Sequence, residues 1–200
     1  MDLHSWNHFN DWAGYTNCLN LYMDLLPYFD LVWIGEGRDY NRAPDHWLIE
    51  VSGIPFGLPG QMLEGGGNPW RGMVYGITNR AGWVGNTPIE IWKFWDEYKI
   101  TDKLLIGYWD ENYLIKSSNS KVFTSLFKGE MESILAVANW SEMDQAVSLN
   151  VRWQSLGIDP STAEIFIPAI KDFQDADENV KFNDLRIPAK KGLLIIIRNK

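Results

Sequence analysis

Residues 31–41, LVWIGEGRDYN, decide the fold that the sequence predicts for the first half of the chain. The apolar run Leu31–Ile34 ends at Gly35, and a short apolar run that stops at a glycine predicts a buried strand. Before it, apolar residues recur at helical spacing over 19–26 and stop near a proline, which predicts an amphipathic helix. After it, Pro44–Val51 has a proline in its first turn, which favours a second helix.

The alternation of strand and helix continues to about residue 100. Met73–Ile77 is another buried apolar run, which predicts the next strand. The sequence Thr87-Pro88-Ile89-Glu90 has the pattern of a capping box with proline at the first helical position, so a helix should begin there. Strands that alternate with helices predict a parallel sheet. Residues 1–102 hold about three such units, which are too few to close a barrel, so we expect a piece of a larger barrel or a small α/β domain.

The second half changes to a period of two. Val147, Leu149 and Val151 alternate with polar residues, and Ile134–Ala138 and Leu193–Ile197 are continuous apolar runs suited to central strands. Polar residues between two such runs predict a hairpin turn at 141–144, and the stretch 157–160 predicts another break. We therefore expect residues 103–200 to form an antiparallel β-sandwich domain.

Composition narrows the classes of partner. The net charge of −8 disfavours nucleic acid, and no apolar run reaches the length of a membrane span. Cys18 is the only cysteine, so no disulfide forms within the chain. No signal peptide is visible at the N-terminus. The chain has 11 tryptophans, which either fill a core or stack on the apolar faces of sugar rings.

Three stretches resemble a known family: LVWIGEGRDYN at 31–41, EVSGIPFGLPGQMLEGGGNPWRGMVYGITNR at 50–80 and ILAVANWSEMDQAVSLNVRW at 134–153. They are similar to the C-terminal region of bacterial glycoside-hydrolase-like proteins related to glycoside hydrolase family 123. The resemblance implies the last part of a (β/α)8 barrel, a C-terminal β-sandwich and action on glycans. It also implies that the missing N-terminal part of the same barrel is a partner, and that the whole protein works in the periplasm or outside the cell. No catalytic residue is carried over from it.

The candidate catalytic residues come from the strand ends, because chemistry in such barrels occurs at the carboxyl ends of the strands. Hydrolysis of an O-glycosidic bond needs two carboxyl groups. Glu36 is the first candidate, since the glycines on either side leave room for a sugar; the alternative is a surface glutamate, or one paired with Arg38. Asp2 is the second candidate, although it could also be a frayed terminal residue.

Other polar and aromatic residues, near the strand ends or in the glycine-rich loop 64–71, are candidate glycan contacts. They are His4, Trp6, Trp33, Asp39, Tyr40, Trp70 and Arg71. Asp39 has the alternative of a turn hydrogen bond, and the tryptophans that of the core. We expect no metal site, because His4 and His8 lack a third ligand, and no cofactor, because the glycine-rich stretch 64–71 lacks the Lys-Ser/Thr of a phosphate loop.

The sequence leaves three classes of function open. The first is a fragment of a glycoside hydrolase that acts through paired carboxylates. The second is a non-catalytic carbohydrate-binding or accessory module, which needs exposed rings and hydrogen-bond donors but no carboxyl pair. The third is a protein unrelated to sugars.

Overall fold

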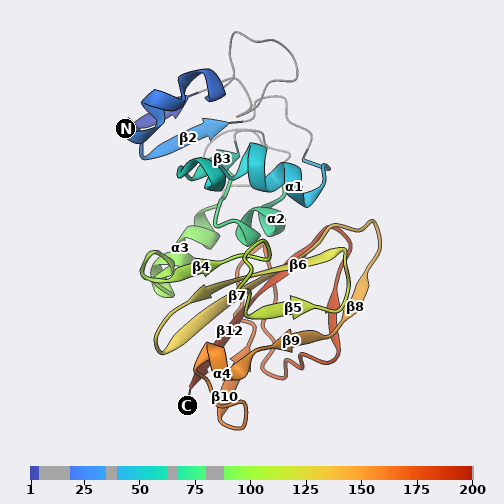
Figure 1. Ribbon diagram of the computed structural model, residues 1–200. Coiled ribbons are helices and arrows are strands. Elements are labelled where there is room, and N and C mark those ends of the chain that lie inside the picture. Colours follow the sequence, from blue (N-terminus) through green and yellow to red (C-terminus); the bar gives the residue numbers. More distant parts are fainter. Residues whose placement is uncertain (5–18, 35–39, 63–66, 80–87, 200) are drawn as a thin grey trace. The chain divides into compact units, whose positions relative to one another are not determined.

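A computed structural model describes residues 1–4, 19–34, 40–62, 67–79 and 88–199 (Figure 1). The chain divides into two compact units, Met1–Pro88 and Ile89–Lys200. The described part contains both helices and sheets, with parallel pairing in unit 1 and antiparallel pairing in unit 2. The division between domains expected at residue 103 stays a prediction.

Unit 1 is built on a parallel sheet of order β1-β2-β3, with β1 at Asp2–His4, β2 at Leu31–Ile34 and β3 at Gly60–Met62. A parallel bridge from Met62 to Asn79 continues this order. The strand predicted at Leu31–Ile34 is therefore confirmed. Val32 is fully buried against Leu26 and Leu58, so one face of the sheet packs on the preceding and following segments.

The helical segments of unit 1 are short. The 3-10 helix η1 spans Leu19–Tyr28 and passes through Pro27, where the sequence predicted an α-helix that stops near that proline. Helix α1 at Pro44–His46 continues into the π-helix η2 at Trp47–Val51, and both lie within the predicted helix. The 3-10 helix η3 covers Ile54–Phe56.

The strand predicted at Met73–Ile77 is wrong. Helix α2 spans Pro69–Val74, and a turn follows it. Proline occupies the first turn, and the side chain of Asn68 caps the helix by accepting a hydrogen bond from the Arg71 backbone N–H at 3.0 Å. The apolar run is buried as predicted, but a run this short does not by itself distinguish a strand from a buried helix.

Unit 2 contains a five-stranded sheet of order β10-β12-β7-β6-β4. Its strands are β4 (Leu104–Ile106), β6 (Val122–Lys128), β7 (Glu132–Asn139), β10 (Ala163–Phe166) and β12 (Gly192–Asn199). Two small antiparallel sheets accompany it: β11 (Leu185–Ile187) with β8 (Gln145–Val147), and β5 (Ile115–Ser117) with β9 (Leu149–Val151). Figure 1 shows β6, β7 and β12 side by side in this unit.

The core of unit 2 contains apolar side chains from all three sheets, such as Leu135, Ile187 and Ile115. The opposite face of the large sheet is buried too, since solvent does not reach Ile134, Ala136 or Ala138. Strands covered on both faces explain the continuous apolar runs in the sequence. Helices complete the unit: α3 at Ile89–Glu97, the 3-10 helix η4 at Ile100–Asp102 and α4 at Trp153–Leu156.

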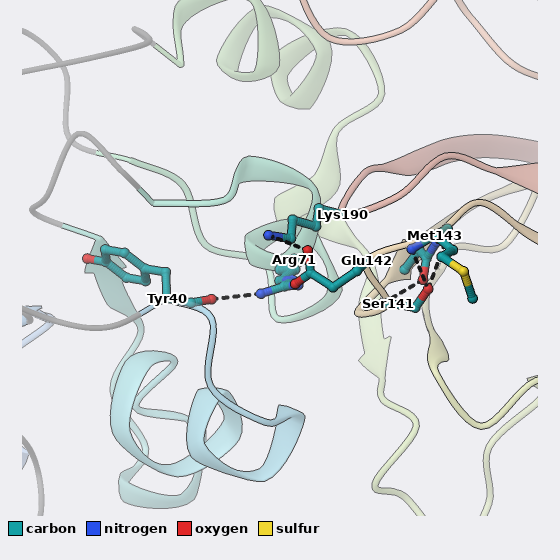
Figure 2. A network of polar contacts seen from close by, with 7 residues as sticks. Tyr40, Arg71, Ser141, Glu142, Met143 and Lys190 are labelled. Atoms are coloured by element: carbon teal, nitrogen blue, oxygen red, sulfur yellow. Dashed lines mark hydrogen bonds and ion pairs between the residues drawn. The ribbon is translucent and has the colours of Figure 1, made fainter.

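The turn predicted at residues 141–144 exists, but it does not join a hairpin. It connects β7 to β8, and these strands lie in different sheets. Asn139 explains the change of direction, because its buried amide donates to the carbonyl of Met143 at 2.8 Å and to that of Ile187 at 3.2 Å. Within the turn, Ser141 Oγ donates to the Met143 carbonyl at 2.7 Å (Figure 2).

The position of β3 leads to a prediction about Gly60. A Cβ added there would overlap the carbonyl oxygen of Val51, a backbone atom that has no side-chain freedom to move aside. We expect Gly60→Ala to lower the free energy of unfolding by about 3 kcal/mol or more, at the upper end of the cost of overpacking. Urea unfolding followed by tryptophan fluorescence measures it.

Gly57→Ala is the matched control. Gly57 has φ of 75° and open space around it, so alanine there should cost only about 1 kcal/mol of backbone strain. Equal losses in the two variants would contradict the close approach at Gly60.

Candidate active site

The candidate site is the edge of the parallel sheet at which the strands of unit 1 end. Register places His4 beside Trp33 and Trp33 beside Gln61, and one residue further it places Ile34 beside Met62 and Met62 beside Asn79. The Met62 backbone N–H donates to the Thr78 carbonyl at 3.1 Å, which holds the last of these neighbours. Ligands of α/β proteins usually bind at the carboxyl ends of parallel strands, so we expect binding or catalytic groups at this edge.

The backbone positions of three predicted site residues follow from this register. His4 is the last residue of β1, and Trp33 is the third of the four residues of β2. Asp2 is the first residue of β1 and lies beside Leu31. At about 3.3 Å per residue, its backbone lies roughly 10 Å before the level of Ile34. Three more predicted residues, Trp6, Glu36 and Asp39, lie outside the described residues.

The remaining predicted site residues, Tyr40, Trp70 and Arg71, are described. Trp70 is partly buried, whereas Tyr40 is 6% exposed and Arg71 only 2% exposed. Arg71 Nη1 donates to the Tyr40 carbonyl oxygen at 2.7 Å (Figure 2). The structure therefore brings Tyr40 and Arg71 together through the backbone of one and the side chain of the other.

Trp47, which is not among the site residues predicted from the sequence, completes this arrangement. Its Nε1 donates to the same Tyr40 carbonyl at 3.3 Å, and its ring is fully buried. The Trp47 ring lies 5.6 Å from the Tyr40 ring and 6.0 Å from the Tyr75 ring, nearly parallel to the latter. The Tyr75 hydroxyl donates to the Pro44 carbonyl at 2.9 Å. We call Tyr40, Trp47, Arg71 and Tyr75 the Tyr40 cluster.

Asn79 is another residue of this edge, and it is not among the site residues predicted from the sequence. It is 5% exposed, and its Nδ2 donates to the Gly67 carbonyl at 3.3 Å. Its Oδ1 is buried and has no hydrogen-bond partner in the described part of the chain. Asn79 therefore joins the carboxyl edge at Met62 to the residue that precedes the cap of α2.

The charged cluster of unit 2 is not a second site of this kind. Arg198 donates to Glu164 at 2.6 Å and lies 3.7 Å from Glu132, whose backbone carbonyl accepts from Lys103 at 3.0 Å. Burial, and then nearby acidic side chains, raise the pKa of Tyr98 beside them. The hydrogen bond to Glu164 raises the pKa of Arg198. Both carboxylates are thus paired with cations and connect strands, as in a structural ion-pair network.

Among the described residues, no group of three or more His, Cys, Asp or Glu could hold a metal ion. No helix in the described ranges is long and apolar enough to cross a membrane.

Comparison with known families matches both units. Residues 1–82 match the glycoside hydrolase 123 TIM-barrel domain, and residues 87–198 match the glycoside hydrolase 123 C-terminal domain. Among solved structures, a GH30 endoxylanase from Clostridium papyrosolvens is similar, with 11% identity, 88% of this chain and 50% of that chain covered, and a TM-score of 0.40. The chain thus spans about half the length of that enzyme. No curated protein matches.

The hydrogen bond of Tyr75 in the Tyr40 cluster predicts how the free energy of unfolding responds to Tyr75→Phe. Tyr75→Phe removes one hydroxyl and leaves the Pro44 carbonyl without that donor, at an almost fully buried position. We expect the free energy of unfolding to fall by about 1–2 kcal/mol, the cost of an unmade buried hydrogen bond. Chemical denaturation of the purified protein measures it.

Tyr28→Phe is the control for that change, because Tyr28 is 72% exposed in the same unit. It should shift the free energy of unfolding by no more than about 0.5 kcal/mol. If both variants unfold at the wild-type midpoint, the Tyr75 hydroxyl contributes nothing to stability.

Proposed function

The chain belongs to the glycoside hydrolase 123 family, and we propose from this premise that it forms part of an enzyme that hydrolyses O-glycosidic bonds of glycans through paired carboxylates. The observation that supports this most is the register of β1, β2 and β3. It brings the carboxyl ends of the strands to one edge, and Glu36 follows the end of β2 by two residues in the sequence. Catalytic groups of (β/α)8 enzymes occupy this edge.

In this proposal Glu36 is one carboxyl of the pair. One group of such a pair protonates the leaving oxygen, and the other attacks the anomeric carbon or activates a water molecule. Asp2 is proposed as the second group. The two carboxyl groups of glycosidases lie about 5–10 Å apart. Because the Asp2 backbone lies at the start of β1, this proposal requires the Asp2 side chain to extend toward the carboxyl edge of the sheet.

Around this pair we propose a glycan subsite. His4, Trp6, Trp33, Asp39 and Trp70 supply hydrogen bonds and rings to the sugar, as the sequence predicts. A flat ring stacks on the apolar C–H face of a pyranose, and the neighbouring polar groups select its hydroxyls. Tyr40, which follows the end of β2 by six residues in the sequence, is proposed to contribute to the same subsite. No step of this reaction requires a metal or a cofactor.

We also propose a barrel and a sandwich as the complete architecture. Barrels of this class have eight parallel strands, whereas the described part of unit 1 has three and one further bridge. The remaining strands would come from a part of the barrel outside this chain, which is then a partner of unit 1. The five-stranded sheet of unit 2 and the two small sheets, which share one core, support a sandwich.

A second candidate function is a carbohydrate-binding or accessory module without catalysis. It is favoured by a row of partly buried rings in unit 2, in which Phe123 lies 4.8 Å from Tyr108 and 5.2 Å from Trp140. Partly accessible rings of this kind suit sugar stacking. The two functions differ in whether a carboxyl group is needed.

The decisive experiment is Glu36→Gln in a protein that contains all eight strands of the proposed barrel. The amide keeps the shape but has no transferable proton, so turnover of p-nitrophenyl glycosides should fall at least about a hundredfold. Binding of the same glycoside should survive, because the amide still forms hydrogen bonds. Release of p-nitrophenol and calorimetric titration measure the two quantities.

Glu130→Gln, at an exposed position of unit 2, is the matched control and should keep wild-type turnover. If Glu36→Gln also turns over at the wild-type rate, Glu36 is not catalytic. If the wild type binds glycosides and hydrolyses none, the binding module is the better description.

A further inference from the structure

Two cationic side chains of unit 2 meet on one tyrosine ring. Lys116 Nζ lies 5.3 Å from the centre of the Tyr113 ring, and Cζ of the Arg152 guanidinium lies 4.5 Å from the same point. Both distances are within the range of an attractive cation–π interaction. The ring therefore holds an ammonium and a guanidinium close together, although like charges repel each other.

The strand pairing places both cations on the outer side of the small sheet formed by β5 and β9. Register sets Lys116 beside Asn150, and Arg152 follows the last residue of β9. Ile115 and Leu149, which occupy the alternate positions, belong to the core of unit 2. The side chains of Lys116, Asn150 and Arg152 therefore face away from that core, and all three residues are exposed. We call Tyr113, Lys116, Asn150 and Arg152 the Tyr113 patch.

No acidic side chain in the described part of the chain pairs with the cations of this patch. Neither Lys116 nor Arg152 forms an ion pair or a side-chain hydrogen bond there, and Glu111, the nearest acidic residue in the sequence, is exposed. Arg198 of the same unit is the contrast, because its Nε lies 2.6 Å from a carboxylate oxygen of Glu164. In a chain of net charge −8, the Tyr113 patch is therefore a local positive site that an anion can neutralise.

The groups of the Tyr113 patch match a sugar that carries a carboxylate. A guanidinium binds both oxygens of a planar carboxylate through two parallel hydrogen bonds, and an ammonium adds a compact point charge. The Asn150 amide offers donors and an acceptor to sugar hydroxyls. A nucleic acid fits this surface less well, because its binding depends on the neutralisation of several phosphates, which an acidic chain opposes.

We propose that the Tyr113 patch is a binding surface for acidic polysaccharides, on which Arg152 and Lys116 bind the carboxylate of a hexuronic acid residue. The two cations support the choice of an acid, whereas the choice of a sugar rests on the proposed function. The patch belongs to unit 2, and the strand ends at which hydrolysis is proposed belong to unit 1. Its role is to hold the polymer, so no residue of the patch takes part in the reaction.

The test is calorimetric titration of the whole chain with polygalacturonate and with its full methyl ester. The two polymers have the same sugar backbone, but the ester has no carboxylate charge. We expect the wild type to bind the acid at low ionic strength and the affinity to fall as salt is added, because salt screens exposed charges. The ester should bind at least about tenfold more weakly, which is the effect of losing hydrogen bonds to a charged group.

Two variants remove one cation each. Arg152→Gln loses the charged, bidentate donor, so its affinity for polygalacturonate should fall at least about tenfold. Lys116→Gln loses one exposed point charge, so its affinity should fall about twofold to fivefold. Arg186→Gln, at an exposed position on β11, changes the net charge by the same amount and should bind as wild type. Urea unfolding at the wild-type midpoint checks that each variant is folded, and Lys116→Gln decides alone if Arg152→Gln is not.

Four results would overturn the inference. They are no binding of polygalacturonate by the wild type, equal binding of the acid and its ester, an equal loss of affinity in Arg186→Gln, and tighter binding of double-stranded DNA than of polygalacturonate. Hydrolysis of p-nitrophenyl glycosides tests the proposed function separately, because those substrates carry no carboxylate. A wild type that binds polygalacturonate through the patch and hydrolyses no glycoside supports this inference and contradicts the proposed function.

Discussion

The close approach of Gly60 to the end of η2 is the constraint on which the candidate site depends. The Gly60 backbone N–H donates to the Ser52 carbonyl at 2.6 Å, and the position of a Cβ is occupied by the Val51 carbonyl. Only glycine lets a strand begin that close to a helix end. Because β3 begins there, it pairs with β2 in the register that sets Ile34 beside Met62. The alignment of the carboxyl ends follows from that register.

In unit 2 the corresponding constraint is burial on both faces of one sheet. Buried side chains of β7 and β12 face the shared core, and those between them are buried on the other side. This is why Ile134–Ala138 and Leu193–Ile197 could be predicted from sequence as central strands, while residues 145–151 kept the alternation of half-buried strands. Strong patterns of apolar residues were enough to predict these elements.

Elements that depend on backbone contacts were harder to predict. Gly60–Met62 has too few apolar residues to form a pattern, and its pairing comes from the approach described above. Met73–Ile77 has the pattern, but its first two residues end a helix that begins four residues earlier at Pro69, after the cap Asn68, and a turn follows them. The hairpin predicted at residues 141–144 failed for a similar reason, since the bonds of Asn139 send the chain to another sheet. In all three segments, helix capping or hydrogen bonds to backbone carbonyls determined the structure that formed.

The same distinction applies to the candidate site. Sequence reasoning named Tyr40 at a strand end and Arg71 in a glycine-rich loop as candidate contacts of one glycan, because polar and aromatic residues beside apolar runs and glycines are visible in the sequence. It could not predict how they meet, since the acceptor is a backbone carbonyl, which every residue has, and the donor lies 31 positions away. A buried arginine resembles a ligand contact in sequence, because both roles select a long cationic donor. What separates them is the identity of the acceptor. Here one acceptor of Arg71 is the Tyr40 carbonyl oxygen, so the guanidinium joins α2 to residue 40 through the backbone.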